Sequence, residues 1–346
     1  MGNSKRAIKQ KDVEKKRLVW ADSLKGLLII LVVLGHAIQN TLGVDCDNNH
    51  IWNAIYSFHM PAFMAISGYL AYRPNSQWGG QNLISVLYRR FRQLIVPFVI
   101  WTLLLLLVGG KFTSENIGFY LLYPDKGLWF LWVLFFITVF FNFGNWISER
   151  IHFKQEVVLA VFCLMFAGSM VAFEIRVLGF QFLAYYFIIY SLGYFLHKYY
   201  DEVVTKNTFV ILLLVVCWGI LAWFWKMHEL PSWLQFVPLP TSLMQYAYRF
   251  ITAALAIYIL MAIAPNLMNS KNKWNAPFIN LGGISLGIYT VHFILTGRIV
   301  SLYRNWMYDD TLAILLSFIT ALMVSWGVVW LLSKWKFTAR WFLGKI

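Results

Sequence analysis

Asp22-Ser23-Leu24-Lys25-Gly26-Leu27-Leu28-Ile29-Ile30-Leu31-Val32-Val33-Leu34-Gly35-His36 is a long apolar run with ionisable residues at both ends. As an α-helix, it places Lys25 and His36 about 16 Å apart along the helix axis. Each residue turns the helix by about 100°, so Asp22, Lys25 and His36 fall on one stripe. Ionisable groups are costly inside a lipid bilayer, and there they indicate a functional site.

The composition is that of a membrane protein. Of the 346 residues, 60% are hydrophobic and 13% are charged, whereas soluble domains average about 45–50% apolar and about 25% charged residues. Aromatic residues make up 18% of the chain, which fits belts of Trp and Tyr at the two membrane surfaces. The net charge of +14 reflects Lys and Arg gathered on one predicted side of the membrane, so it does not indicate a nucleic-acid partner.

Ten stretches are long and apolar enough to cross a bilayer, which takes about 20 residues. The bias of Lys and Arg across the loops between them places both termini in the cytoplasm. We therefore expect an all-α, polytopic protein of the inner or plasma membrane, with one transmembrane domain (19–333) between two basic tails (1–18 and 334–346). The ten predicted spans cover residues 19–39, 51–72, 93–110, 128–147, 155–173, 180–197, 208–226, 244–264, 280–300 and 312–333.

Signatures of soluble metalloproteases and nucleotide-binding enzymes are absent, since HExxH, Walker and Rossmann patterns do not occur. A GxSxG spacing occurs at Gly283–Gly287, but no nearby acid accompanies it, so spacing indicates no serine nucleophile. Cys46, Cys163 and Cys217 form no CxxC pair, and neither a disulfide framework nor a zinc site is predicted. Two histidines at membrane depth lack an acidic partner there, so we expect no metal.

His36 is the first candidate for chemistry, because imidazole titrates near neutrality and is the commonest general base. The alternative is a neutral histidine that is hydrogen-bonded inside the helix bundle. His59 enters on the second span from the opposite side and reaches a similar depth. Two histidines from adjacent spans would then share one cavity.

Basic residues crowd the cytoplasmic start of the third span, where Arg89, Arg90 and Arg92 lie within four positions. Topology alone would place arginines there, but guanidinium forks also suit phosphate groups. Lys25 and Asp22 also have two interpretations. They form an intrahelical ion pair in which the lysine reaches toward the membrane surface, or they form a site for an anionic ligand.

Further polar residues lie inside or at the ends of other predicted spans. Spacing puts Ser285, Tyr289 and His292 on one face of the ninth span, and Arg249 and Arg298 also lie within spans. A polar seam between helices is the alternative to a functional role for these residues.

Together, these segments resemble the acyltransferase-3 family of bacterial membrane proteins. The resemblance rests on the Asp-x-x-Lys-Gly run that ends in Leu-Gly-His, and on Phe-His-Met-Pro-x-Phe-x-x-x-Ser-Gly-Tyr from Phe58 to Tyr69. The arginine-rich start of span three, Leu-Trp-Phe-Leu in span four and Ser-x-x-x-Tyr-x-x-His in span nine also match. The chain looks most similar to the fucose 4-O-acetylase-like or polysaccharide O-acyltransferase branch. The family often has Arg where this chain has Lys25, which lacks the bidentate fork.

The resemblance implies transfer of an acyl group, usually acetyl, from cytoplasmic acyl-CoA to a hydroxyl of a cell-surface glycan. His36 would be the general base, either directly or through an acyl-histidine, and His59 would be the second catalytic residue. The implied partners are acetyl-CoA, the glycan or its lipid-linked precursor, and the bilayer, and a homodimer is left open. Lys25, Arg89, Arg90 and Arg92 are the candidates for CoA binding, and Asp22, Ser67, Trp129, Tyr289 and His292 are those for substrate binding.

An exporter or flippase for a polysaccharide or small solute is the alternative function from another class. It would move solute without turnover of acyl-CoA. Its sequence signature is a pair of Gly- or Pro-broken spans in two related halves, and no such symmetry is visible here.

Overall fold

The computed structural model describes residues 18–74, 80–173, 177–269 and 272–345, and within these ranges it contains helices and no strand. The all-α prediction is confirmed. Nearly all of the predicted N-terminal tail lies outside the described residues. The long helices are α2 (Val19–Leu42), α3 (His50–Tyr69), α4 (Gly80–Arg90), α5 (Val96–Val108), α7 (Trp129–Arg150), α8 (Gln155–Phe173), α9 (Phe180–Lys198), α11 (Thr208–Trp223), α12 (Thr241–Leu267), α14 (Ser285–Arg304) and α15 (Asp310–Ser333).

Short helices connect the long ones and do not reach across a membrane. The α-helical ones are α6 (Ser114–Leu122), α10 (Tyr200–Val203), α13 (Ala276–Gly283) and α16 (Lys336–Phe342). Six-residue η1 (Gly43–Asn48) continues directly from α2.

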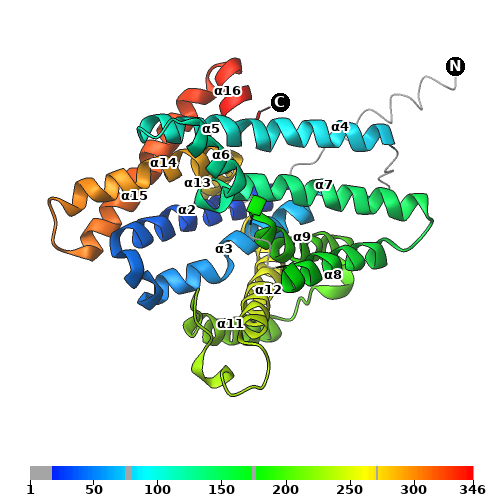
Figure 1. Cartoon of the computed structure of the whole chain (residues 1–346). Helices are drawn as coiled ribbons and strands as arrows, with labels where there is room; N and C mark the ends of the chain where they lie inside the picture. Colours follow the sequence, from blue (N-terminus) through cyan, green and yellow to red (C-terminus); the bar gives the residue numbers. More distant parts are fainter. Residues whose placement is uncertain (1–17, 75–79, 174–176, 270–271, 346) are drawn as a thin grey trace.

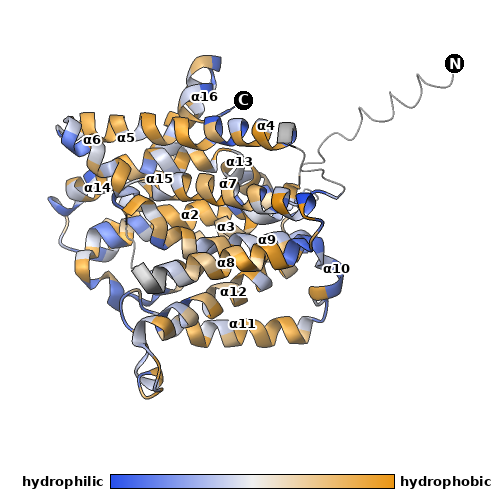
Figure 2. Ribbon diagram, turned by 45° about the vertical axis from the view of Figure 1, so that its right-hand side comes forward, coloured by the Kyte–Doolittle hydropathy of each residue, from blue (hydrophilic) through white to orange (hydrophobic). Residues whose placement is uncertain are grey.

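Within the described residues, seven helical segments are long and apolar enough to span a membrane. They contain α2, α4 with α5, α7, α9, α12, α14 and α15. The other three predicted spans are also helical: α3 falls outside the seven, and α8 and α11 are shorter apolar helices. The chain is thus multi-pass, but the count of ten is not confirmed, and the side on which each terminus lies stays a prediction. Apolar residues cover the long helices, and polar residues gather at their ends and in the loops (Figure 2).

Two glycines bring α2 and α13 into backbone contact. A Cβ added to Gly26 would lie 1.9 Å from the carbonyl oxygen of Phe278, and one added to Gly282 would lie 1.7 Å from that of Asp22. Such small-residue contacts are the usual way for helices to approach closely in membranes. They hold the Asp22–Lys25 end of α2 against α13.

The same device joins α3 to α9. A Cβ on Gly68 would lie 1.9 Å from the carbonyl oxygen of Tyr190, and one on Gly193 would lie 1.9 Å from that of Ala65. Both helices that carry the motif residues of the first two spans are therefore fixed by backbone packing.

The predicted ninth span is two helices, not one. The chain breaks at Ile284 between α13 and α14, and the Ser285 hydroxyl donates to the Gly282 carbonyl at 3.0 Å. Ser285 therefore closes the turn, so the expected shared face with Tyr289 and His292 does not include a free serine hydroxyl. Beyond the break, α14 packs against α2, α5 and α15.

A π-helical turn, Phe91–Ile95, joins α4 and α5 into one long helix that runs along the top of the view in Figure 1. The Val96 N–H bonds to the Phe91 carbonyl, five residues back. Single π-turns inside α-helices occur frequently at functional sites. The helix therefore begins well before the predicted start of the third span, and α4 packs beside α7.

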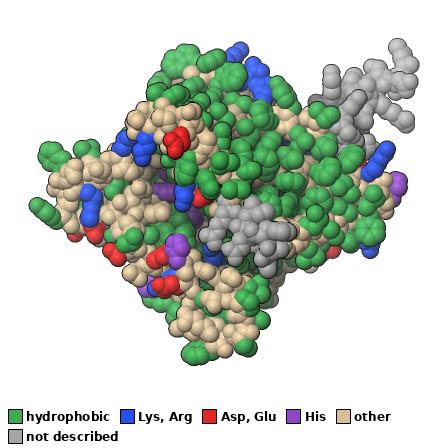
Figure 3. Space-filling view, in the orientation of Figure 1, with side chains coloured by type: hydrophobic (Ala, Val, Ile, Leu, Met, Phe, Trp, Pro, Cys, Tyr) green, Lys and Arg blue, Asp and Glu red, His purple; other side chains and the backbone are tan. Residues whose placement is uncertain are grey.

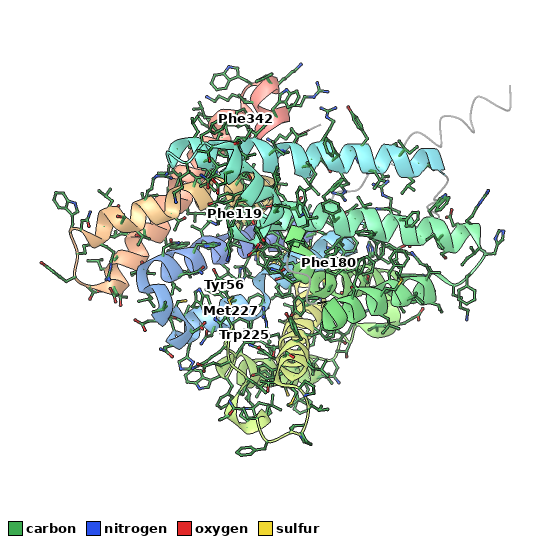
Figure 4. All side chains as sticks on the ribbon, in the orientation of Figure 1. Tyr56, Phe119, Phe180, Trp225, Met227 and Phe342 are labelled. Atoms are coloured by element: carbon green, nitrogen blue, oxygen red, sulfur yellow. The ribbon has the colours of Figure 1, made fainter. Side chains whose placement is uncertain are left out.

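The C-terminal segment is also helical and packs on α5. The Trp101 indole N–H donates to the Phe342 carbonyl at 2.8 Å, and Figure 4 labels Phe342 next to α5. Gly344 adopts a φ of 62° and lies so close to the Gln93 backbone that a Cβ would be 2.4 Å from its carbonyl oxygen. The predicted basic tail 334–346 is thus part of the packed structure in its described residues.

Candidate active site

Three helices bring His36, His59 and His292 to one place in the bundle. The ring centroids of His36 on α2 and His292 on α14 are 5.2 Å apart. The ring of Tyr56 on α3 contacts His36 and His59, with ring centroids 6.4 Å and 4.7 Å apart. The expected proximity of His36 and His59 is therefore present, with a tyrosine ring in contact with both.

Hydrogen bonds to the backbone assign the tautomers of two of these histidines. His59 Nδ1 lies 2.7 Å from the Ile55 carbonyl oxygen, and His292 Nδ1 lies 2.9 Å from that of Ile288. A carbonyl accepts, so each Nδ1 carries the hydrogen and each Nε2 of the neutral ring carries a lone pair. His292 Nε2 is buried and has no hydrogen-bond partner among the described residues.

His36 differs from its two neighbours in access and in bonding. As a residue, His36 is partly exposed, whereas His59 and His292 are 2% and 0% exposed. Its ring contacts those of Tyr56, His292 and Phe293, and its ring nitrogens make no hydrogen bond to another residue in the described part of the chain. Histidine side chains are visible in a hollow near the middle of the face in Figure 3. His36 is the one of the three that is not fully buried.

Tyr56 and Gln39 are site residues that the sequence analysis missed. The Tyr56 hydroxyl donates to Gln39 Oε1 at 2.7 Å, which ties α3 to α2 beside the histidines. Gly35 makes room for that ring, since a Cβ there would lie 2.8 Å from Tyr56 Cε2. The signal was spacing: Gln39 follows His36 by three positions and Tyr56 precedes His59 by three, which puts each pair on one helix face.

Tyr289 and the start of α7 extend the site on its other side. The Phe130 N–H donates to the Tyr289 hydroxyl at 3.4 Å, and the Tyr289 ring lies 5.8 Å from that of His292. Trp129, next in the chain to Phe130, stacks on Phe182 and Tyr186 of α9. Tyr289 and Trp129 thus lie in one connected group of rings with the histidines.

Asp22 and Lys25 form a separate site at the far end of α2. Lys25 Nζ lies 2.7 Å from Asp22 Oδ1, so the expected intrahelical pair is present. Asp22 is buried and Lys25 is partly exposed. Asp22 precedes His36 by about 21 Å along the helix axis, and the two sites are therefore joined by the helix and not by contact.

Ser67 is not brought to the histidines. Its hydroxyl donates to the Phe63 carbonyl at 2.9 Å, and it follows His59 by about 12 Å along α3. Its predicted position beside a substrate at His36 has no support in this geometry.

The three predicted CoA-binding arginines lie at the junction of α4 and the π-turn, and all are half-buried. Arg90 Nη1 donates to Gln93 Oε1 at 3.3 Å, and Arg90 Nε is buried without a hydrogen-bond partner among the described residues. The Arg92 guanidinium lies 5.8 Å from the centre of the Tyr88 ring. Arg89 shares this junction, so the cluster offers donor groups that the described protein does not fully use.

A surface pocket of about 430 Å³ lies at the break between α13 and α14, away from the histidines. It is lined by Ala276, Ile279, Asn280, Gly283 and Ile284. These residues belong to the segment that packs against the Asp22–Lys25 end of α2. Within the described ranges, no group of three or more His, Cys, Asp or Glu side chains is placed to hold a metal ion.

Comparison with known families settles the class. The family model described as "Acyltransferase domain" matches residues 18–331. This chain belongs to the acyltransferase-3 family. With its multiple apolar spans, it is a multi-pass member of that family, and the family resemblance expected from the motifs is confirmed.

Two curated relatives of this chain carry the name "Nodulation protein NolL". The one from Sinorhizobium fredii (strain NBRC 101917 / NGR234) is 35% identical over 164 residues, 40% of this chain and 41% of the relative. The one from Mesorhizobium japonicum (strain LMG 29417 / CECT 9101 / MAFF 303099) is 29% identical over 150 residues, 36% and 37% of the two chains. The chain thus spans less than half the length of the curated relatives it matches. No solved structure matches this chain.

Proposed function

We propose that this acyltransferase moves an acetyl group from cytoplasmic acetyl-CoA to a hydroxyl of a cell-surface glycan, with His36 as the general base. The family supports acyl transfer, and the spans support a multi-pass protein of the inner or plasma membrane. The donor, the acceptor and the role of each residue belong to the proposal. The transmembrane domain would comprise residues 19–333, as expected from the sequence.

The observation that carries the proposal is the state of the His36 ring. The ring belongs to a partly exposed residue, contacts the rings of Tyr56, His292 and Phe293, and has no hydrogen bond to the described protein. One of its nitrogens is therefore available to a hydroxyl group of a substrate. A general base needs this access before its basicity matters.

The reaction balances with His36 as the single proton carrier. Its free nitrogen takes the proton from the acceptor hydroxyl while that oxygen attacks the thioester carbonyl carbon. The carbon–sulfur bond then breaks, and the thiolate leaves with the proton that His36 returns. The products are the O-acyl glycan and free CoA thiol, and no oxidant or metal is required. His59, with its Nε2 lone pair, would orient the acceptor by accepting a hydrogen bond.

The basic groups support binding of the donor on the other side of the bundle. The half-buried cluster of Arg89, Arg90 and Arg92 would hold the CoA phosphates through charge-assisted hydrogen bonds. Lys25 would add a point charge at the end of α2. Because α14 packs against both α2 and α5, the pantetheine arm would reach His36 along α14, between the first and third predicted spans.

Mass spectrometry of surface glycans tests this proposal. A strain that lacks the gene is complemented with the wild type, His36→Ala or the control His152→Asn. His152 is exposed and has a φ of 53°, a conformation that Asn tolerates. We expect one additional acyl group on glycans from the wild-type and His152→Asn strains and none with His36→Ala. Full acylation with His36→Ala would refute the mechanism, and an unchanged glycan mass with the wild type would refute the function.

A further inference from the structure

Arg249 is an intramembrane cation that the proposed reaction does not use. It lies on α12 about 12 Å along the axis from Thr241, where the helix begins, and its side chain is half-buried. α12 is one of the segments that are long and apolar enough to span the membrane. A charge at such a position is costly unless it has a partner, and it indicates a functional site.

The recorded contacts of Arg249 are with two aromatic rings. Its guanidinium carbon lies 5.8 Å from the ring centre of Tyr185 on α9 and 5.8 Å from that of Trp225, just after α11. No residue in the described ranges forms an ion pair or hydrogen bond with it. Contacts with ring faces leave the five N–H donors at the edge of the guanidinium group without an acceptor.

Arg298 shows what a structural arginine in a span of this protein does. Its Nη1 donates to the Ile294 carbonyl at 2.7 Å and its Nη2 donates to the Val108 carbonyl at 3.2 Å. The second bond joins α14 to the end of α5, which is the polar seam considered from the sequence. Arg249 has no such bonds, so a seam does not explain it.

One row of rings connects Arg249 with the proposed active site through α9 and α7. The ring centroids of Tyr185 and Tyr186 are 5.0 Å apart, and those of Tyr186 and Trp129 are 5.1 Å apart. Trp129 is followed by Phe130, whose ring lies 5.6 Å from Tyr289 beside His292. The arginine thus borders the same aromatic region as the histidines.

A second row reaches His36 from the other side. Trp225 lies 6.5 Å from Trp52, which stacks on Tyr56 at 4.0 Å. Figure 4 labels Tyr56 and Trp225 in the same part of the view, and Trp225 belongs to a buried apolar cluster against which Tyr56 packs. Trp52 and Trp225 are each 1% exposed, so this row is a packed apolar wall that links the surroundings of Arg249 to those of His36.

We propose that Arg249 binds an anionic group of the acyl acceptor, a phosphate or a carboxylate attached to the glycan whose hydroxyl reaches His36. This inference rests on the proposed function, because it takes the glycan as acceptor. Either group accepts two parallel N–H bonds from one guanidinium fork. A neutral acceptor would leave that charge unpaired within the membrane, so the site selects acidic or phosphate-linked glycans.

Binding to the purified protein in detergent, without acetyl-CoA, tests the proposal. The anionic probes are a polyprenyl diphosphate and a tetragalacturonate, and the matched neutral probes are a polyprenol and maltotetraose. We expect the wild type to prefer at least one anionic probe over its neutral match. Arg249→Gln should lower the affinity for that probe by at least about tenfold, the loss expected for a charge-assisted contact. Arg249→Lys should bind with intermediate affinity, and Arg298→Gln should bind like the wild type.

The two anionic arms identify the source of the anion, a lipid carrier phosphate or a sugar carboxylate. Equal binding of charged and neutral probes would overturn the proposal, as would wild-type affinity in Arg249→Gln or equal losses in Arg249→Gln and Arg298→Gln. If Arg249→Gln does not fold, as judged by gel filtration and melting temperature, Arg249→Lys decides in its place. Binding is measured apart from acyl transfer, so this proposal and the proposed function fail independently.

Discussion

The imidazole rings of His36 and His292 lie 5.2 Å apart, although one is on the first described helix and the other is on α14. His292 is held by its own helix through Nδ1, and its buried Nε2 has no partner among the described residues. His292 therefore lies beside the partly exposed His36, carries an unpartnered Nε2 lone pair and does not itself meet solvent. This geometry suits a residue that orients His36.

Changes at His292 are expected to lower kcat while leaving KM for acetyl-CoA unchanged. His292→Asn keeps a donor near the Ile288 carbonyl but loses the Nε2 acceptor, and we expect at least about a tenfold loss of kcat. His292→Gln places a polar group near the Nε2 position and should retain more activity than His292→Asn. Release of CoA thiol from acetyl-CoA measures both constants. Equal losses in the two variants would contradict an orienting role.

Tyr56→Phe should separate the two contributions of this tyrosine. The variant keeps the ring beside His36 and His59 and loses the hydrogen bond to Gln39, which is worth about 1 kcal/mol. We expect a lower melting temperature with activity retained within a few-fold. Tyr56→Ala also removes the ring and should lower activity strongly. Wild-type thermal stability in Tyr56→Phe would show that the hydroxyl bond contributes nothing.

Gly26→Ala is expected to disrupt the contact of α2 with α13. The new Cβ would lie 1.9 Å from the Phe278 carbonyl oxygen, and backbone on both sides resists the shift, so we expect a loss of about 1–3 kcal/mol or more. Gly219→Ala on α11 is the control, since nothing lies within 4 Å of its Cβ position. It should be neutral or slightly stabilising. Thermal unfolding in detergent compares the two, and equal melting temperatures would argue against the backbone contact.

Arg90→Lys should raise KM for acetyl-CoA by about tenfold with little change in kcat, since lysine keeps the charge but loses the guanidinium fork. Arg150→Lys provides the control, because Arg150 is exposed at the end of α7 and lies on the same predicted side of the membrane. Steady-state kinetics at constant ionic strength measure both. The same rise in KM for both variants would assign the effect to surface charge and not to a phosphate site.

The helices could be predicted from sequence because an apolar run of span length is a local property. The break at Ile284 could not, since Gly282 and Gly283 lie in a run that stays apolar without proline. The similar depth of His36 and His59 could be predicted, because the number of residues from the start of each span gives the depth of a residue in the membrane. Contact between His36 and His292 depends on which helices are neighbours, and periodicity carries no information on that.

Arg249 is a second case in which the sequence could not predict the surroundings of a side chain. The sequence placed it and Arg298 inside spans and treated them alike. Their difference lies in what surrounds them: two carbonyl oxygens bind Arg298, and two aromatic rings flank Arg249. Only tertiary structure separates a satisfied cation from one that still needs an acceptor.

Because of the π-turn at Phe91–Ile95, the number of residues in this segment sets the orientation of the arginines on α4 relative to α5. One residue more than a regular helix needs separates α4 from α5, and each residue rotates a helix by about 100°. Deleting a single apolar residue there would rotate Arg89 and Arg90 to a different side of the helix relative to α5, although every basic side chain would be retained. In comparisons with homologous chains, a one-residue gap in this segment would therefore matter more than a substitution.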